Sequence, residues 1–347
     1  MEFPQVLIFD ASESERDAAD ELARVIAGSG IETPFALCSP HGKQLAQSLH
    51  SPFSVEVPPA GADQAWAADL GSRVHRLGAD AVVALGGGLT LDLGKLAAAR
   101  AGLSVVSVPT QLAHDGICSP VAVVADQEGR AQSLGAIAPH IVFVSLPTIV
   151  GAPPASIRAG IGDLLANPLA LRDWRLAVER GLEEMNERAW QLSVESHRLI
   201  EPHLDVDVNV AAKDPDFLKE LANALTLSGM AMIRSGTSRP ASGGEHEISH
   251  AIDQLFGGRA LHGEQVAFGC IASVALYGED VTAFRARLER LGLPHHPEQL
   301  QLSEDDVVAV LLEAPNTRPG RFTIIEDAHL DEASARALVK RIWSEAW

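Results

Sequence analysis

Two kinds of segment alternate along the first 145 residues. Short runs of consecutive apolar residues, typical of strands buried on both faces, lie between stretches whose apolar residues repeat at helical spacing. Such alternation predicts βαβ units and a mainly parallel sheet. We predict strands at residues 5–9, 33–38, 81–85, 104–108, 121–124 and 141–144, and helices at 15–27, 63–77 and 91–100.

The pattern changes after Pro147. From about Pro154 to the end, apolar residues recur at helical spacing and strand-like runs nearly vanish. The 347 residues also fit two domains of about 150 residues each. We therefore predict an α/β domain at residues 1–150 and an all-helical domain at residues 151–347. The helices of the second domain are expected at 177–199, 217–233, 247–255, 266–276 and 331–347.

A triple glycine, Gly86 to Gly88, follows the predicted strand at 81–85 and precedes a helix. Glycine lets the backbone approach a phosphate closely, and a helix N-terminus offers free N–H groups. The segment does not match the G-x-G-x-x-G fingerprint, because Leu89, Thr90 and Leu91 follow the three glycines. It does not match the Walker pattern either, because Lys95 is not followed by Ser or Thr. A triple glycine is often a plain tight turn, but this context favours a dinucleotide pyrophosphate site. We expect Asp92 to cap or orient the turn.

A second loop, residues 109–116, follows the next strand. Ligands of open α/β sheets bind at the carboxyl ends of the strands. We therefore expect Thr110 and Asp115 beside the same crevice as the glycine turn. Ser39, His41 and Lys43 follow the second strand, where a 2′-phosphate could sit, so both NADH and NADPH stay open.

Three histidines lie between residues 239 and 269. His246 and His250 are four apart and would share a helix face, and His262 follows a break at Gly257–Gly258. Two helices meeting across that break could direct His246 and His262 to one point. A catalytic zinc-type site needs three protein ligands, so the third must come from elsewhere. Without it the pair indicates a metal site only weakly, because such spacing is common in core and surface histidines.

Charge and cysteine content narrow the function classes. The net charge is −19, which makes nucleic acid and anionic membranes poor partners, so an anionic substrate would need a local basic pocket. Cys38, Cys118 and Cys270 form neither a disulfide framework nor a cysteine-based zinc motif. The N-terminus does not read as a signal peptide, and no apolar run is long enough for a membrane span. We expect a soluble, cytoplasmic protein.

Six segments extend this picture: GGGLTLDLGK, SVPTQLAHDGICSP, AGIGDLLAN, SRPASGGEHEISHAID, LHGEQVAFG and TRPGRF. In this order they resemble the sn-glycerol-1-phosphate dehydrogenase family, within the superfamily of glycerol dehydrogenase, iron-containing alcohol dehydrogenases and dehydroquinate synthase. The resemblance covers roughly residues 85–325. It implies a dehydroquinate synthase-like fold, with a Rossmann-like N-terminal domain, an all-α C-terminal domain and the site in the cleft. It also implies a homo-oligomer.

The resemblance assigns roles by matching position. It implies that Asp163, His246 and His262 bind the metal. Asp115, Asp163 and His250 would contact the substrate. Asp115 and His250 would be catalytic, with His250 the candidate for proton delivery. The implied nucleotide contacts are Gly86, Gly87, Gly88, Leu89, Thr90, Asp92, Thr110, Gln111, Leu112, Ala113 and Ser119.

The implied reaction is reduction of dihydroxyacetone phosphate by NADH or NADPH to sn-glycerol 1-phosphate. One divalent ion, zinc or nickel, would polarise the ketone. Alternatives are a dehydrogenase of another small polyol or polyol phosphate, a sugar-phosphate cyclase of the dehydroquinate synthase type, and a catalytically inactive binding protein. Against a cyclase, position 163 is Asp where such enzymes carry Glu, and residues 240–258 contain no Lys or Arg.

Two positions depart from the family pattern. Ala113 replaces a hydroxyl residue of the nucleotide loop, and Asn316 stands where a lysine is common. If that lysine helps to hold substrate phosphate, the substrate could differ. Arg239, Arg318 and Arg321 are the remaining candidates for phosphate binding, with structural salt bridges an equal alternative for each.

Overall fold

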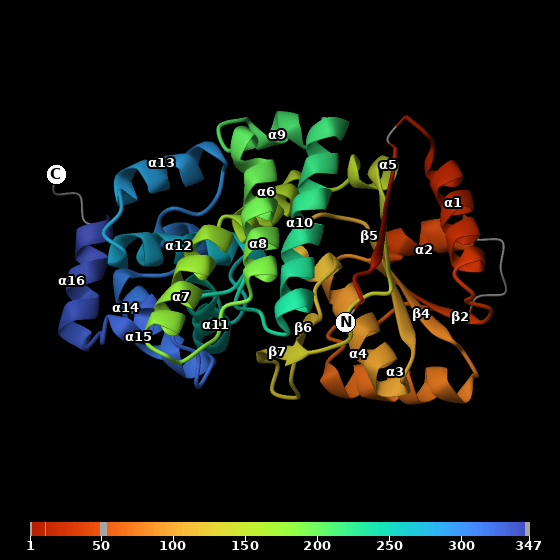
Figure 1. Ribbon diagram of the computed structural model, residues 1–347, viewed down its shortest axis with the longest axis horizontal. Helices are drawn as coiled ribbons and strands as arrows, with labels where there is room; N and C mark the ends of the chain where they lie inside the picture. The colour runs from red at the N-terminus through yellow and green to blue at the C-terminus, as the bar shows by residue number, and fades with distance from the viewer. Residues whose placement is uncertain (1, 11, 49–53, 344–347) are drawn as a thin grey trace.

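The computed structural model describes residues 2–10, 12–48 and 54–343. An α/β half lies at one end of the elongated molecule and a helical half at the other (Figure 1). All described strands fall between Gln5 and Ser145, and the described chain beyond Ser145 is helices and their connections. The predicted fold class is confirmed.

The main sheet is parallel throughout its described pairings. Its strand order is β1-β8-β5-β4-β2-β3, and its strands are β1 (Gln5–Phe9), β2 (Pro34–Cys38), β3 (Ser54–Glu56), β4 (Ala81–Gly86), β5 (Ser104–Pro109) and β8 (Ile141–Ser145). The carboxyl ends of β4 and β5 are neighbours, with Gly86 opposite Pro109. The two loops that follow these strands therefore start side by side, as predicted.

Helices cover both faces of this sheet. Val82 and Ala84 of β4 pack into the same buried cluster as α3 (Gln64–Arg76) and α4 (Gly88–Ala101). The alternate residues of β4 face α1 (Glu15–Gly28) and α2 (Pro40–Ser48). Because both faces are buried, the central strands are mostly apolar on both sides, which explains the nearly continuous apolar runs.

The strand predicted at 121–124 does not join the main sheet. It is β6 (Val121–Ala125), which pairs antiparallel with β7 (Ala131–Gly135) in a separate hairpin between the two halves (Figure 1). The sequence pattern missed β7, and also β3 and α2. β7 and β3 are short and contain exposed positions, so neither carries a buried apolar run.

Twelve helices follow β8 in the described chain: α5 (Leu146–Ile149), α6 (Pro154–Leu164), α7 (Asn167–Glu179), α8 (Glu187–Ile200), α9 (Val208–Ala211), α10 (Pro215–Ser235), α11 (Gly244–Phe256), α12 (His262–Leu276), α13 (Val281–Arg290), α14 (Glu304–Glu313), α15 (Ile324–Asp327) and α16 (Glu332–Trp343). Single 3₁₀ turns occur at Asp115–Ile117, Glu201–His203, Pro297–Leu300 and Ala314–Thr317. One continuous buried cluster runs from the α3 and α4 face of the sheet into these helices.

The single helix predicted at 177–199 is wrong. The chain leaves α7 after Glu179, and Gly181 adopts a left-handed conformation with a φ of +71°. α8 then starts afresh with Asn186 as its N-cap, whose side chain accepts a hydrogen bond from the Ala189 N–H. A glycine followed by a capping asparagine is a stop-and-start signal that the apolar spacing hid.

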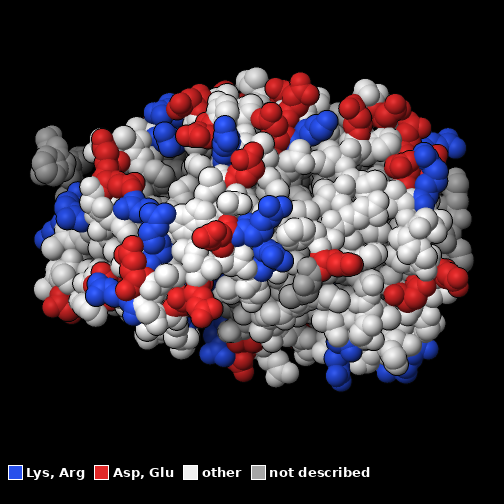
Figure 2. All heavy atoms as spheres, viewed as in Figure 1, with Lys and Arg blue, Asp and Glu red and all other residues white. Residues whose placement is uncertain are grey.

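Charged side chains are spread over the surface. On the face shown in Figure 2, acidic groups gather along the upper edge, over α9, α10 and α1, with basic groups interspersed. With a net charge of −19, this surface does not draw in anions as a whole. A site for an anionic ligand must therefore carry its own basic groups, as the composition predicted.

Candidate active site

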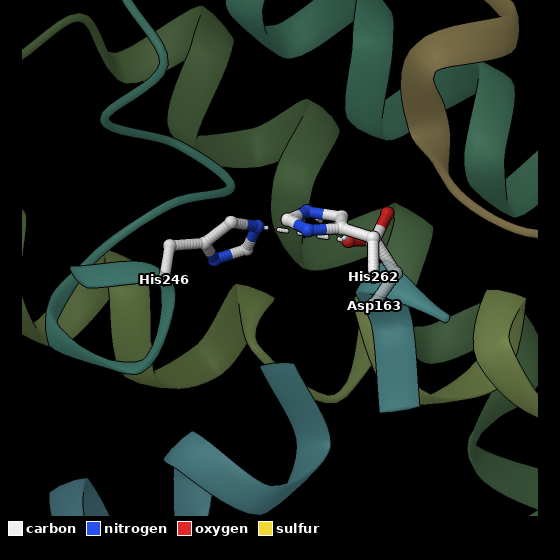
Figure 3. Close-up of side chains that lie close together, drawn as sticks. All are labelled: Asp163, His246 and His262. Atoms are coloured by element: carbon white, nitrogen blue, oxygen red, sulfur yellow. Dashed lines mark ion pairs between the residues drawn. The ribbon is translucent and has the colours of Figure 1, made fainter. Parts of the chain in front are cut away.

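Asp163, His246 and His262 converge in the helical half (Figure 3). Their ligand atoms all lie within 4.8 Å of one another. The Nε2 atoms of His246 and His262 are 3.6 and 3.8 Å from Oδ1 of Asp163. Two atoms bound to one tetrahedral ion at bonds of about 2 Å lie roughly 3.3 Å apart, so the spacing fits a shared divalent ion. The donor set of two imidazoles and one carboxylate fits it as well.

Close helix contacts through glycine bring the three side chains together. A Cβ atom on Gly162 would overlap the carbonyl oxygen of Gly263, and one on Gly263 would overlap that of Ala159. A Cβ on Gly269 would likewise overlap the carbonyl oxygen of Glu245. Glycine thus lets α12 lie directly against α6 and α11. Asp163, His262 and His246 adjoin these contacts in the chain.

The break between the two histidine helices forms as predicted. Gly257 ends α11 with a φ of +71°, and His262 is the first residue of α12. His246 lies in the first turn of α11. The two imidazoles therefore come from the starts of two contacting helices, with ring centroids 5.2 Å apart.

The charge state of the cluster suits metal ligation. Burial and the neighbouring His246 lower the pKa of His262 to about 3, so this imidazole is neutral with a free lone pair. Burial acts to raise the pKa of Asp163, but its contacts with His246 and His262 bring it below the ordinary value. A buried carboxylate beside two imidazoles is an arrangement that a cation stabilises.

Asp115 stands next to this cluster. Its backbone N–H donates to Oδ2 of Asp163 at 2.8 Å, and its own carboxylate accepts a hydrogen bond from the Ser228 hydroxyl, also at 2.8 Å. Burial and the Asp163 carboxylate raise the pKa of Asp115 to about 7. The loop from the sheet is thus bonded directly into the helical half.

The glycine turn, Gly86 to Gly88, belongs to the α/β half and lies across the site from the metal-ligand cluster. Gly87 is the N-cap of α4, and the carbonyl of Gly86 accepts a hydrogen bond from the Thr110 N–H at 3.0 Å. Cβ atoms on Gly87 and Gly88 would overlap the side chains of Gln111 and His114. The second loop therefore packs onto the turn, and a larger residue there would displace a side chain of that loop.

One cavity of about 190 Å³ joins the two walls. Gly88 and Leu89 line it from the nucleotide side, and His246 and His262 from the helical side. Asp115 and Ser119 also line it, in agreement with their predicted positions. A larger outer cavity, about 690 Å³, shares Ser238, His250 and Arg318 with the inner one.

Comparisons with known proteins show the family to which this chain belongs. The glycerol-1-phosphate dehydrogenase [NAD(P)+] of Hyperthermus butylicus is 37% identical over 259 residues, which cover 75% of this chain and 73% of that protein. The enzyme of the same name from Methanothrix thermoacetophila is 38% identical over 259 residues, covering 75% and 72%. The chain belongs to the glycerol-1-phosphate dehydrogenase family. Residues 3–153 also match the profile described as iron-containing alcohol dehydrogenase.

Solved structures show the same fold. A probable glycerol dehydrogenase from Sinorhizobium meliloti superimposes with a TM-score of 0.81 at 19% identity, covering 99% of this chain and 97% of that one. Glycerol dehydrogenase from Schizosaccharomyces pombe gives 0.78 at 18% identity, covering 98% and 89%. The predicted family and fold class are both confirmed.

No helix in the described part of the chain has the length and apolar character of a membrane span.

Asp92 does not have the role expected for it. It lies within α4, where its carboxylate forms an ion pair with Lys95 at 2.8 Å and accepts a hydrogen bond from the Val123 N–H at 2.9 Å. No side-chain hydrogen bond caps the described start of α4. Asp92 therefore fastens β6 to α4 and does not orient the glycine turn, although it still lines the inner cavity.

The other predicted nucleotide contacts divide into two groups. Leu112 is fully buried in the core, so its side chain is not placed to meet a ligand. Thr90 and Ala113 are also buried. Thr110 and Gln111 are half-buried beside the turn, where Gln111 packs against Gly87.

His250 is held in a neutral state. Its Nε2 lies 2.9 Å from Nη2 of Arg318, and because a guanidinium only donates, Nε2 accepts. Burial and the Arg318 charge lower the pKa of His250 well below its ordinary value. Nε2 therefore carries no proton, so the predicted proton delivery, which stays a prediction, would use Nδ1. His250 lines both cavities and stays a candidate substrate contact.

Sequence reasoning missed Glu245. This buried carboxylate accepts hydrogen bonds from the Gly243 N–H at 2.6 Å and from Nδ1 of His246 at 3.0 Å. The bond fixes the imidazole with Nε2 toward Asp163. The signal was present, since Glu245 directly precedes His246, but its direction depends on the helix start.

The arginine candidates separate clearly. Arg239 bonds Glu183 at 2.9 Å and the carbonyl of Phe322 at 2.6 Å, which supports the structural alternative. Asn316 bonds Glu313, and it lines neither cavity. Arg318 and Arg321 do line the cavities.

Proposed function

We propose that this chain reduces dihydroxyacetone phosphate to sn-glycerol 1-phosphate with NADH or NADPH and a divalent metal ion. The observation that carries the proposal is the shared inner cavity, which is lined by Gly88 of the nucleotide turn and by His246 and His262, the two histidines that cluster with Asp163. The family relationship supports it, because the relatives are named glycerol-1-phosphate dehydrogenase [NAD(P)+]. Residues 1–150 would bind the nucleotide, and residues 151–347 the metal and substrate.

Each wall would supply one part of the site. Asp163, His246 and His262 would hold zinc or nickel, which acts on a bound ketone as a Lewis acid. Gly86 to Gly88 and the first N–H groups of α4 would bind the pyrophosphate. Ser39 lies beside Gly86, so the segment after β2 would meet the adenosine ribose and accept either cofactor.

Asp115 and His250 would position the substrate between these parts. Arg318 fixes the neutral His250 ring through Nε2, which leaves its proton on Nδ1. Ser228 fixes the carboxylate of Asp115. Both side chains are thereby oriented before the substrate arrives, which lowers the entropy lost on binding. We further propose a cytoplasmic homo-oligomer with no nucleic-acid partner.

Absorbance of the reduced nicotinamide tests the proposal. Purified, metal-loaded protein would be given NADH or NADPH with dihydroxyacetone phosphate, dihydroxyacetone or glyceraldehyde 3-phosphate. We expect oxidation with dihydroxyacetone phosphate and sn-glycerol 1-phosphate as the product. Reaction with dihydroxyacetone alone would indicate an unphosphorylated polyol as the substrate. Release of phosphate from a sugar phosphate without net loss of NADH would indicate a cyclase.

A further inference from the structure

The outer cavity contains two arginines, Arg318 and Arg321, that form no ion pair with any carboxylate in the described part of the chain. We propose that Arg318 and Arg321 form a guanidinium pair that binds the phosphate group of the substrate. This inference rests on the proposed function and specifies which residues select a phosphorylated ketone over an unphosphorylated one.

The local sequence Arg318-Pro319-Gly320-Arg321 builds the pair. The Arg321 N–H donates to the carbonyl of Arg318 at 3.0 Å, which closes a β-turn. Pro319 at the second position and Gly320 at the third, with a φ of +86°, are typical of a type II turn. The turn places both arginines at its two ends, close together in space.

Neighbouring serines hold the two guanidinium groups in place. Arg321 donates to the Ser238 hydroxyl at 2.8 Å and to the carbonyl of Ser242. Arg318 donates to the hydroxyls of Ser242 and, at 3.4 Å, Ser238. Each guanidinium has five N–H donors, so these contacts leave donors free on both. The pair is positioned but not satisfied.

The pair also lacks a direct ion-pair partner among the described residues, although the Glu245 and Glu247 carboxylates act on it from a greater distance. Within the described part of the chain, no carboxylate lies within ion-pair distance of Arg318 or Arg321, whereas Arg239 in the same cavity bonds Glu183. Burial and the nearby positive charge of Arg318 lower the pKa of Arg321 to about 9. Adjacent half-buried cations repel each other, and a dianionic phosphate would relieve that repulsion with bidentate hydrogen bonds.

The position of the pair fits a short phosphorylated ketone. Arg318 lines both cavities and bonds His250, which is one helical turn from His246. Arg321 lines only the outer cavity. A phosphate on the pair would therefore leave the carbonyl end of a three-carbon chain directed into the inner cavity. The cofactor pyrophosphate is assigned to the opposite wall.

Substitutions at Arg321 test the pair, because Arg321 does not contact His250. The variants are Arg321→Met, which keeps length and removes charge, and Arg321→Lys, which keeps charge and loses the planar fork. Gln254→Ala is the matched control, since Gln254 lines the same cavity without charge. Each metal-loaded protein would be assayed with dihydroxyacetone phosphate and with dihydroxyacetone. Inhibition by inorganic phosphate, NADH affinity and thermal unfolding would be measured alongside.

We expect Arg321→Met to lower kcat/KM for dihydroxyacetone phosphate by about 10- to 100-fold, the range for losing a charged hydrogen bond. With dihydroxyacetone the change should stay within about threefold, and inhibition by phosphate should weaken in parallel with kcat/KM. Arg321→Lys should lie between wild type and Arg321→Met, and Gln254→Ala should match wild type.

Equal losses of kcat/KM for both substrates in a folded Arg321 variant, or no loss for either, would overturn the proposal that the pair binds the substrate phosphate. If Arg321→Met does not fold, Arg321→Lys must still weaken phosphate inhibition. A failure of the proposed function looks different. Wild type would then leave dihydroxyacetone phosphate unreduced, while calorimetry with inorganic phosphate would still show binding that depends on Arg321.

Discussion

The two walls of the cleft present their ligand groups in different ways. The α/β wall offers backbone: Gly88 lines the inner cavity, and the side chains of Gln111 and His114 pack against Gly87 and Gly88. The helical wall offers side chains, namely Asp163 and two histidines from three separate helices. One wall works because side chains are missing, and the other because particular side chains are present.

This difference predicts two kinds of failure. An added side chain on the glycine wall should exclude the nucleotide by steric overlap and leave the metal bound. A removed side chain on the helical wall should keep the shape and lose the chemistry. Variants that separate these outcomes test the comparison directly.

The largest effect should follow loss of a ligand on the helical wall. His246→Ala should lose its metal, and activity should fall roughly 10³-fold or more, since a Lewis acid contributes several kcal/mol to the transition state. Elemental analysis and turnover measure the two effects. His250→Ala should keep its metal, with turnover reduced about 10²-fold through lost substrate positioning. A metal-free His250→Ala beside a metal-replete His246→Ala would exchange the two assignments.

Gly88→Val should break the other wall. Even a Cβ atom at this position overlaps the His114 ring, so the turn must shift away from the nucleotide. We expect NADH affinity to fall about 10²-fold, as for loss of several hydrogen bonds, with metal content unchanged. Fluorescence titration with NADH gives the affinity. Gly28→Val is the control, because no atom lies near a Cβ at Gly28. Normal NADH binding by folded Gly88→Val would show that the pyrophosphate does not bind at this turn.

Glu245→Gln tests whether the carboxylate that orients His246 supports metal binding on the helical wall. The bond to Nδ1 of His246 orients a ligand and increases its basicity, and loss of such a partner lowers metal affinity about 10- to 100-fold. Competition with a metal chelator measures the affinity. Glu247→Gln is matched, because Glu247 flanks His246 on the other side but bonds Thr323. Equal affinities for the two variants would show that Glu245 does not orient His246.

The smallest effect should come from helix packing. Gly269→Ala places a Cβ against the carbonyl oxygen of Glu245 and must push α12 from α11. Overpacking of this kind costs about 1–3 kcal/mol, so the free energy of unfolding should fall by that amount in urea titrations. Metal affinity should weaken in step, because the same contact fixes His246 relative to His262. Gly151→Ala, on an open surface, should leave both quantities at wild-type values.

The same contrast explains what the sequence could predict. The strand, glycine turn and helix of residues 81–101 follow one another, so their local pattern was sufficient. Asp163 has no local signal, since an Asp after Gly162 reads equally well as a capping residue, and only the family resemblance singled it out. Glu245 and the glycine contacts of α12 depend on packing between helices far apart in sequence. Periodicity cannot reveal such contacts, and it also concealed the break at Gly181.

Lys95 determines how the cleft can move. This buried lysine donates to the carbonyls of Gly116 and Val121, which ties the loop after β5 to α4. The same loop bonds the helical half through the Asp115 N–H to Asp163. The loop after β5, which forms the base of the cleft, is therefore held by hydrogen bonds from both halves of the molecule. Opening and closing would move the outer rim with its arginine turn, while the hairpin stays fastened to α4 through Lys95 and Asp92 and the separation between nucleotide turn and metal cluster stays constant.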